Sequence, residues 1–367
     1  MKLDILHVLS DTGVGGAGIF LRNLISASDS DVFSHSVILP RGALVLADIL
    51  KRAGARVTLG SFRGERSLSL GMLGAAAHAI RVCRPDILHT HGAFSAALSP
   101  SLTLTSIPVL TTLHCAVPYR GSRLAGRLSR RFWTATSDEA ARVLRSRGIP
   151  DGRIRKIKNG SLRSLPPSDA ERSAARYALG LSPNDFAVGI SARLEPIKDH
   201  GTAIFAVREL VSRGEGATLV IIGDGSRRGE LSALTEELGI KSHVIFTGFI
   251  QDTRSVYSAL DAHLNCSLGS ETSCLAVSET MAMGIPQAVS DCAGNLELVG
   301  GGRGALVFPK GDPLALAACL GSLMRDEALR RRYSDAAREL FEKELTAERM
   351  AREYERYYIE LCKPSAR

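Results

Sequence analysis

Short apolar runs typical of buried β-strands alternate with helical periodicities along almost the whole chain of 367 residues. The first examples are strand-like runs at Leu3–His7 and Ser36–Leu39, which flank a helical stretch at about Ala17–Ala27. A repeated strand, helix, strand order forces parallel strands, because each helix returns the chain to the end of the sheet where the previous strand began. We therefore predict an α/β fold made of doubly wound, Rossmann-like parallel sheets.

The length of 367 residues predicts two domains, because chains longer than about 250–300 residues usually divide into domains with separate hydrophobic cores. A stretch rich in Ser and Pro at 161–168 interrupts the alternation and is typical of a linker. We place one domain at residues 1–165 and a second at 166–345, followed by a helix and a short disordered tail at 346–367. Two such sheets are expected to face each other across a cleft.

The charge is divided unevenly, since residues 1–163 hold 23 of the 46 Lys and Arg but only 10 of the 38 Asp and Glu. This excess favours an anionic partner, and nucleic acid is the weakest candidate because no nucleic-acid motif is present. A helix predicted over 118–133 carries Phe132, Trp133 and an arginine stripe, which consists of Arg120, Arg123, Arg127 and Arg130. The arginine stripe suits docking on an anionic membrane, although such stripes are also common on solvated helix faces.

Two further features bear on location. No run of eighteen apolar residues is present, and the amino terminus is typical of a first strand rather than of a cleavable signal. The seven cysteines form no paired-spacing motif, so neither disulfides nor a zinc site is expected. We expect a cytoplasmic protein that is peripheral on the inner face of the membrane if the arginine stripe docks there.

The stretch 267–286 joins a predicted strand at Ala262–Cys266 to a predicted helix at Leu275–Met283. The N–H groups of residues 273–275 would lie at the helix N-terminus, where unpaired donors and the helix dipole favour an anion such as a diphosphate. Glu271 and Glu279 bracket this terminus with carboxylates that can bind hydroxyl groups. The combination suits a nucleotide sugar, although two Glu at this spacing also occur on ordinary amphipathic helices.

The first loop contains a GxGxxG pattern at 13–18, which raises a dinucleotide site as a hypothesis. Three residues separate this pattern from the strand, and no acidic residue follows the second strand. We interpret Gly15 and Gly16 as part of a flexible loop that meets an acceptor at the mouth of a cleft. An NADP site using Arg41 is the alternative.

Three histidines end predicted strands, at the edge of a parallel sheet where ligands bind: His89, His91 and His114. His89 and His91 share one strand face, so the geometry is compatible with zinc. No carboxylate or cysteine stands at ligand spacing, which weakens that hypothesis. Sugar contact and a purely structural role remain the two stronger alternatives.

Five motifs resemble, in order and spacing, glycosyltransferase family 4 of the GT-B fold. They are Asn159-Gly160, Ser191–Lys198, Ile222–Gly225, Phe246–Phe249 and the E(x7)E pair Glu271/Glu279 that continues to Pro286. The likeness spans nearly the whole chain and is strongest from Asn159 to Glu297.

The resemblance implies a retaining transfer of a sugar from a nucleoside diphosphate sugar to a saccharide or lipid-linked acceptor, in cell-envelope polysaccharide or glycolipid synthesis. It implies no metal or other cofactor, because Arg193 and Lys198 would neutralise the donor diphosphate. Glu271 would bind the transferred sugar and Glu279 the ribose. The other implied donor contacts are Gly223, Gly248, Phe249, Cys274 and Leu275.

The first domain would then bind the acceptor, and the helix at 346–367 would cross back to it and form part of a hinge. His114 looks like the family's cleft histidine near the sugar C6 hydroxyl and the reacting centre, and it is expected to be catalytic together with Arg193, Lys198 and Glu271. Gly15 and Gly16 look like the family's acceptor-side loop, and we place His91 on the acceptor side as well. Thr272-Ser273-Cys274, Asp199 and Gln287-Ala288 depart from the family pattern. The alternatives are a nucleotide-sugar 2-epimerase of the same fold and a non-catalytic binding module. The presence of Arg193 and Lys198 together with Glu271 and Glu279 favours sugar transfer over these alternatives.

Overall fold

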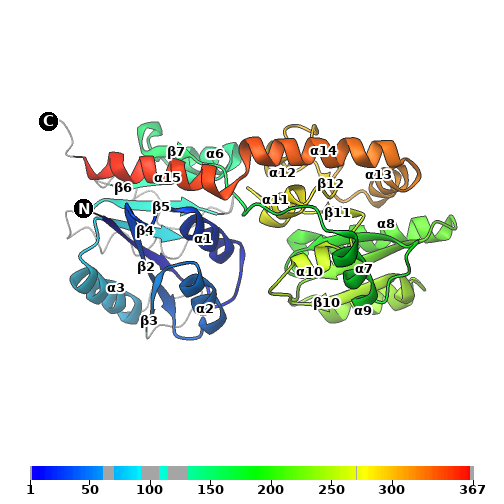
Figure 1. Cartoon of the computed structure of the whole chain (residues 1–367), viewed down its shortest axis with the longest axis horizontal. Helices are drawn as coiled ribbons and strands as arrows, with labels where there is room; N and C mark the ends of the chain where they lie inside the picture. The colour runs from blue at the N-terminus through cyan, green and yellow to red at the C-terminus, as the bar shows by residue number, and fades with distance from the viewer. Residues whose placement is uncertain (1, 61–69, 92–106, 115–130, 270, 364–367) are drawn as a thin grey trace. The chain divides into compact units, whose positions relative to one another are not determined.

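The computed structural model describes residues 2–60, 70–91, 107–114, 131–269 and 271–363. The chain separates into two compact units, of which the first is Met1–Leu162 with Glu344–Arg367 and the second is Arg163–Lys343. Each unit contains one parallel β-sheet with helices packed on it (Figure 1). The predicted architecture of two Rossmann-like α/β domains is thereby confirmed.

The first unit has a seven-stranded sheet in the order β3-β2-β1-β4-β5-β6-β7. Its strands are β1 Leu3–Leu9, β2 Phe33–Pro40, β3 Arg56–Gly60, β4 Ile87–His91, β5 Val109–Leu113, β6 Arg131–Ala135 and β7 Ile154–Lys156. Its helices are α1 Gly16–Ala27, α2 Leu44–Arg52, α3 Leu70–Cys83, α6 Asp138–Ser146 and α15 Ala347–Cys362.

The two faces of this sheet differ in chemistry. Alternate residues of β1 point to opposite faces, so Leu6 and Val8 join an apolar cluster with Ala79 of α3. His7 points to the other face, where the hydroxyls of Tyr354 and Tyr358 from α15 reach the strands. One face of the sheet is therefore apolar, whereas the other carries a buried polar layer beneath α15.

The carboxy-terminal helix is part of the first unit. Ser161 and Thr346 form a parallel bridge where the chain returns, and α15 lies alongside the first sheet (Figure 1). A Cβ at Gly160 would stand 2.3 Å from the carbonyl oxygen of Thr346, so the backbones meet there at a distance that only glycine allows.

The second unit has a six-stranded sheet in the order β10-β9-β8-β11-β12-β13. Its strands are β8 Phe186–Ser191, β9 Ala217–Ile222, β10 Val244–Gly248, β11 Ala262–Asn265, β12 Gln287–Ser290 and β13 Leu306–Phe308. Its α-helices are α7 Asp169–Ala178, α8 His200–Ser212, α9 Arg228–Glu237, α10 Arg254–Tyr257, α11 Leu275–Ala282, α12 Ala293–Leu298, α13 Pro313–Arg325 and, running into the first unit, α14 Glu327–Glu344.

The predicted helix over 118–133 is wrong at its carboxyl end. Residues 131–135 form strand β6, which pairs with β5 and β7, and Trp133 is buried on it. Aromatic and β-branched residues in this short run favour a strand, and burial inside the sheet outweighs the helical spacing of the preceding arginines. The arginine stripe itself lies outside the described residues.

Helix α7 was missed, and its signal was present in the sequence. Ser168 accepts a hydrogen bond from the N–H of Glu171, while the Glu171 carboxylate accepts one from the N–H of Ser168. This capping box begins the helix directly after the prolines that suggested a linker.

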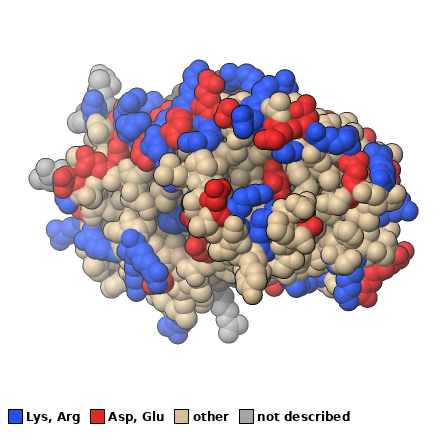
Figure 2. Space-filling model, turned by 45° about the vertical axis from the view of Figure 1, so that its right-hand side comes forward, with Lys and Arg blue, Asp and Glu red and all other residues tan. Residues whose placement is uncertain are grey.

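The surface drawn in Figure 2 carries Lys and Arg side chains mixed with Asp and Glu. Many are paired, as in Arg56–Asp4 at 3.0 Å and Lys241–Glu236 at 2.6 Å. Among the described helices, none combines the length and the apolar character that a membrane span requires.

Candidate active site

The loop between β11 and α11 forms at the carboxyl edge of the second sheet, as the sequence predicted. α11 begins after Cys274, which has extended backbone angles and provides no side-chain cap. The positive end of the helix dipole therefore points toward the loop that carries Glu271. Ser270 lies outside the described residues.

Lys198 and Glu271, which are 73 residues apart in sequence, form an ion pair through the Lys198 Nζ and the Glu271 Oε2. Both side chains are mostly buried, with exposed fractions of 24% and 10%. The Ser267 hydroxyl donates a second hydrogen bond to the same carboxylate oxygen, at 2.8 Å. Burial acts to lower the pKa of Lys198, but the Glu271 carboxylate outweighs it and the pKa is raised above its ordinary value. The cation therefore stays charged while it is held beside the α11 terminus.

Backbone hydrogen bonds tie the other predicted donor loops to this pair. Gly223, after β9, donates to the carbonyl of Gly248 at 2.9 Å, and Leu268 donates to the carbonyl of Ile197 at 2.9 Å. Gly223 has φ +134°, and a Cβ there would stand 2.2 Å from the carbonyl oxygen of Ala192. Only glycine fits this approach, which brings the loop after β9 against the loop that carries Arg193.

Three further predicted donor residues flank this cluster. Arg193 is exposed, and its positive charge acts to lower the pKa of Lys198. Phe249 leaves 52% of its surface exposed directly after Gly248. Glu279, on α11, lies 3.5 Å from the hydroxyl of Tyr257, which donates to its Oε2. The second unit thus gathers two cations, two carboxylates and an exposed aromatic ring on neighbouring loops and on α11.

A buried polar network behind the loop was not predicted. Ser267 donates its N–H to Asn265 Oδ1 at 3.0 Å, and its carbonyl accepts from Ser290 Oγ and Cys292 Sγ, both at 2.7 Å. Asn295 donates to Asn265 Oδ1 at 3.2 Å. These bonds fix the base of the Glu271 loop, and no spacing in the sequence indicates them because three separate segments supply the partners.

Gly294 provides a second support for the same loop. A Cβ at this position would lie 2.0 Å from the carbonyl oxygen of Glu271, so the start of α12 packs directly on the Glu271 backbone. The clash is with backbone rather than with a flexible side chain, and relief would require the loop to move.

The predicted acceptor-side residues lie in the first unit. Gly15 is the N-cap of α1, and α1 begins at Gly16. His91 ends β4, His114 follows β5, and their rings are joined by a hydrogen bond between His91 Nδ1 and His114 Nε2 at 3.2 Å. Burial lowers the pKa of His114 to about 3, so its ring is neutral at physiological pH. The structure therefore brings His91 and His114 together at the carboxyl edge of the first sheet.

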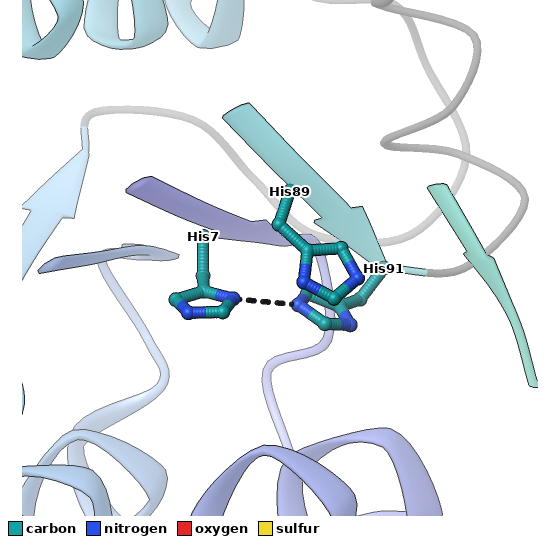
Figure 3. A group of neighbouring side chains, drawn as sticks. All are labelled: His7, His89 and His91. Carbon is teal, nitrogen blue, oxygen red and sulfur yellow. Dashed lines mark hydrogen bonds between the residues drawn. The ribbon is translucent and has the colours of Figure 1, made fainter. Parts of the chain in front are cut away.

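Within the described residues, one group of side chains has ligand atoms close enough to hold a metal ion: His7, His89 and His91, all within 4.8 Å of one another. Figure 3 shows His7 hydrogen-bonded to His91, with His89 beside them. Both ring nitrogens of His7 and both of His89 already have hydrogen-bond partners. A metal would have to break several of these bonds, so the donor set fits a hydrogen-bonded cluster better than a metal centre.

Two family models match adjacent parts of the chain. The model described as Glycosyltransferase Family 4 matches residues 14–161, and the model described as Glycosyl transferases group 1 matches residues 171–340. The loops described above fall inside these two matches. The fold and the site thus define a GT-B glycosyltransferase. The chain belongs to the glycosyltransferases of family 4 and group 1, which confirms the resemblance found in its motifs.

Curated relatives of the chain are also named as glycosyltransferases. A 2-deoxystreptamine N-acetyl-D-glucosaminyltransferase of Streptomyces fradiae is 28% identical over 72% of this chain and 69% of its own length. A phosphatidyl-myo-inositol mannosyltransferase of Mycobacterium leprae is 25% identical over 69% of this chain and 68% of its own. The putative glycosyltransferase EpsD of Bacillus subtilis is 28% identical, and the match covers 58% of each chain.

Solved structures share the fold. Anabaena HepE in complex with UDP and glucose superposes with a TM-score of 0.85 at 18% identity, covering 97% of this chain and 99% of that one. WaaG, a glycosyltransferase involved in lipopolysaccharide biosynthesis, has a TM-score of 0.72 at 13% identity over 97% and 99%. The predicted GT-B fold is confirmed.

Proposed function

We propose that the protein is a retaining glycosyltransferase that moves a sugar from a nucleoside diphosphate sugar to a saccharide or lipid-linked acceptor, in cell-envelope polysaccharide or glycolipid synthesis. The observation that carries the proposal is the partly buried ion pair of Lys198 and Glu271 beside the N-terminus of α11. The names of the relatives, which include a 2-deoxystreptamine N-acetyl-D-glucosaminyltransferase and a phosphatidyl-myo-inositol mannosyltransferase, support the same reaction class.

Lys198 and Arg193 would bind the donor diphosphate. Without donor, the ammonium of Lys198 is held by Glu271, and a bound diphosphate offers it a more highly charged partner. As the glycosidic bond breaks, negative charge grows on the leaving diphosphate. Cations already in place and the α11 dipole stabilise that charge without reorganisation. In this scheme protein cations do the work that a divalent metal does elsewhere.

Glu271 would then turn from Lys198 to the hydroxyls of the transferred sugar. The hydrogen bond from Ser267 keeps one of its carboxylate oxygens oriented during that exchange. Glu279 would hold the ribose hydroxyls, with its carboxylate oriented by Tyr257. The amides of Cys274 and Leu275 and the loops at Gly223, Gly248 and Phe249 complete the donor site.

For the acceptor half of the reaction we assign Gly15, Gly16, His91 and His114. Retention implies that the acceptor hydroxyl attacks the face from which the diphosphate leaves. A donor phosphate oxygen would take the proton of that hydroxyl, so no side-chain base is needed. We place the reaction in the cytoplasm, where free thiols such as those of Cys266 and Cys292 stay reduced.

A panel of nucleoside diphosphates and their sugars, read by thermal shift, identifies the donor, because a ligand that binds the folded state raises the melting temperature. Transfer is then measured with that donor in Lys198→Gln and Glu271→Gln. Each should lower kcat by about 10²–10³-fold, since each removes a group that acts on the transition state. Lys241→Gln is the matched control, because it removes the same charge from an exposed pair. Near-normal turnover in Lys198→Gln would refute the proposal.

A further inference from the structure

Four histidines of the first unit, three of them buried and His114 partly exposed, form a continuous hydrogen-bonded chain. His35 Nδ1 meets His7 Nε2 at 2.9 Å, His7 Nδ1 meets His91 Nε2 at 3.0 Å, and His91 Nδ1 meets His114 Nε2 at 3.2 Å. Figure 3 shows the central link between His7 and His91. We call these four residues the histidine chain. Its links cross the sheet from β2 over β1 and β4 to the end of β5.

The strand register explains the geometry. His35 pairs with Ile5, His7 pairs with His89, and His91 pairs with Thr112. His7, His91 and His114 therefore each follow, by two residues, the residue that pairs with the preceding histidine of the chain. A step of two residues keeps the side chain on the same face. The histidine chain thus runs diagonally from the middle of β2 to the carboxyl edge, where ligands of parallel sheets bind.

His89 lies on the same face but outside the chain. Its Nδ1 meets the Tyr358 hydroxyl and its Nε2 meets the Thr112 hydroxyl, both at 2.7 Å. It is as deeply buried as His7 and His91. His89 therefore serves as an internal control of the same residue type and burial.

Counting protons leaves the chain only two arrangements. Burial lowers the pKa of all four rings, so each ring is neutral at physiological pH and carries one N–H. Three links need one hydrogen each, so every ring must donate in the same direction along the chain. Either all four rings carry the hydrogen on Nδ1, or all four carry it on Nε2.

The hydrogen bonding of His35, at the buried end of the chain, distinguishes the two arrangements. Within the described residues, His35 Nε2 is buried without a hydrogen-bond partner. The Nε2–H arrangement would leave an N–H donor orphaned at this position, and orphaned buried N–H groups are rarer than under-satisfied acceptors. The Nδ1–H arrangement leaves only a ring lone pair there, and its hydrogens all point toward His114.

We propose that the histidine chain fixes His114 as its Nδ1–H tautomer and so sets the polarity of this N–H donor at the carboxyl edge of the first sheet. His35, His7 and His91 are then positioning residues that act through His114. The use of that donor in sugar transfer rests on the proposed function, whereas the tautomer does not. A second consequence is that the tautomer of His114 is coupled to that of His35, three links away.

The direct test is nuclear magnetic resonance of protein labelled with ¹⁵N-histidine, in the absence of substrate at about pH 7.5. Long-range ¹H–¹⁵N correlations distinguish protonated from bare ring nitrogens. All four rings of the chain should have hydrogen on Nδ1 and a bare Nε2, which is the less common tautomer of free histidine. Nε2–H tautomers at His114 and His91 would overturn the proposal. Because this measurement needs neither donor nor turnover, it is independent of whether the protein transfers a sugar.

Variants separate positioning from packing. His7→Phe fills the space but cuts the chain, so His114 should lose its single tautomer and kcat should fall roughly tenfold with little change in the KM for donor. His7→Gln should restore both, because its amide accepts from His35 through oxygen and donates to His91 through nitrogen. His89→Gln should leave the His114 tautomer and kcat unchanged. Equal losses in His89→Gln and His7→Phe would assign the histidines a packing role only.

The same sample tests the metal alternative. ZnCl₂ alone is added to the wild-type protein in equimolar amount while the ring signals are followed. The signals of His7, His89 and His91 should stay unchanged, because their nitrogens are already hydrogen-bonded to one another and to α15. Stoichiometric loss of the Nδ1–H signals with zinc bound would replace the histidine chain by a metal site.

Discussion

Acidification should unfold the first unit well before the second. Five histidines with lowered pKa values lie in the first unit: the buried His7, His35, His89 and His91 and the partly exposed His114. The second unit has two described ones, His200 and His263, with pKa values of about 4. For a lowered pKa the unfolded state binds more protons at mildly acid pH, so the free energy of unfolding falls as the pH drops below about 6.5.

The magnitude follows from linkage. Between about pH 7.5 and about pH 5.5, a histidine that stays neutral when folded but ionises when unfolded costs about 1.4 kcal/mol of stability. Five such groups amount to about 7 kcal/mol, against a total stability of about 5–15 kcal/mol for a typical domain. Two groups in the second unit amount to only about 3 kcal/mol.

The assay uses the single tryptophan of the chain, Trp133, which is buried on β6 of the first unit. Urea unfolding followed by its fluorescence reports that unit, while far-ultraviolet circular dichroism reports both. We expect the fluorescence midpoint to move to much lower urea at about pH 5.5, ahead of the dichroism transition, with a free energy of unfolding smaller by about 5–7 kcal/mol. His89→Gln should reduce this pH dependence by about one fifth. A free energy of unfolding that differs by less than about 1 kcal/mol between the two pH values would show that these histidines do not stay neutral in the folded protein.

Three other outcomes are expected. Asp199 has φ +48° and caps α8 through the N–H of Thr202, so Asp199→Ala should lower the free energy of unfolding by about 1–2 kcal/mol in urea titrations, whereas Asp199→Gly should be nearly neutral. Gly294→Ala should displace the Glu271 loop and lower kcat about 100-fold in the transfer assay, and wild-type kcat would contradict this. Charge reversal in the arginine stripe should abolish sedimentation with anionic vesicles, and unchanged sedimentation would remove the membrane hypothesis; the reversed positions are Arg123, Arg127 and Arg130.

The sequence was sufficient for the architecture because strand and helix signals are local. The predicted strand and helix around Glu271 correspond to β11 and α11 within one residue at each end. The error at 131–135 arose where two local signals compete, since the arginine spacing is helical while the next five residues are strand-like. Only pairing with β5 and β7 decides that case.

The arrangement of the site depends on contacts that no local pattern encodes. Lys198 meets Glu271 because β8 and β11 are neighbours in the sheet, although 73 residues separate the two side chains. The histidine chain depends on the register of four strands, because successive histidines are offset by two residues along neighbouring strands. A shift of one residue in any strand would turn its histidine to the apolar face.

If protein cations stabilise the departing diphosphate, the rate of sugar transfer should not depend on a divalent cation. The initial rate of sugar transfer is measured in excess EDTA and again with Mg²⁺, for wild type and for Lys198→Gln. The wild-type rate should be the same in both, and Lys198→Gln should be about 10²–10³-fold slower in both. A wild-type rate that collapses in EDTA and returns with Mg²⁺ would contradict the account.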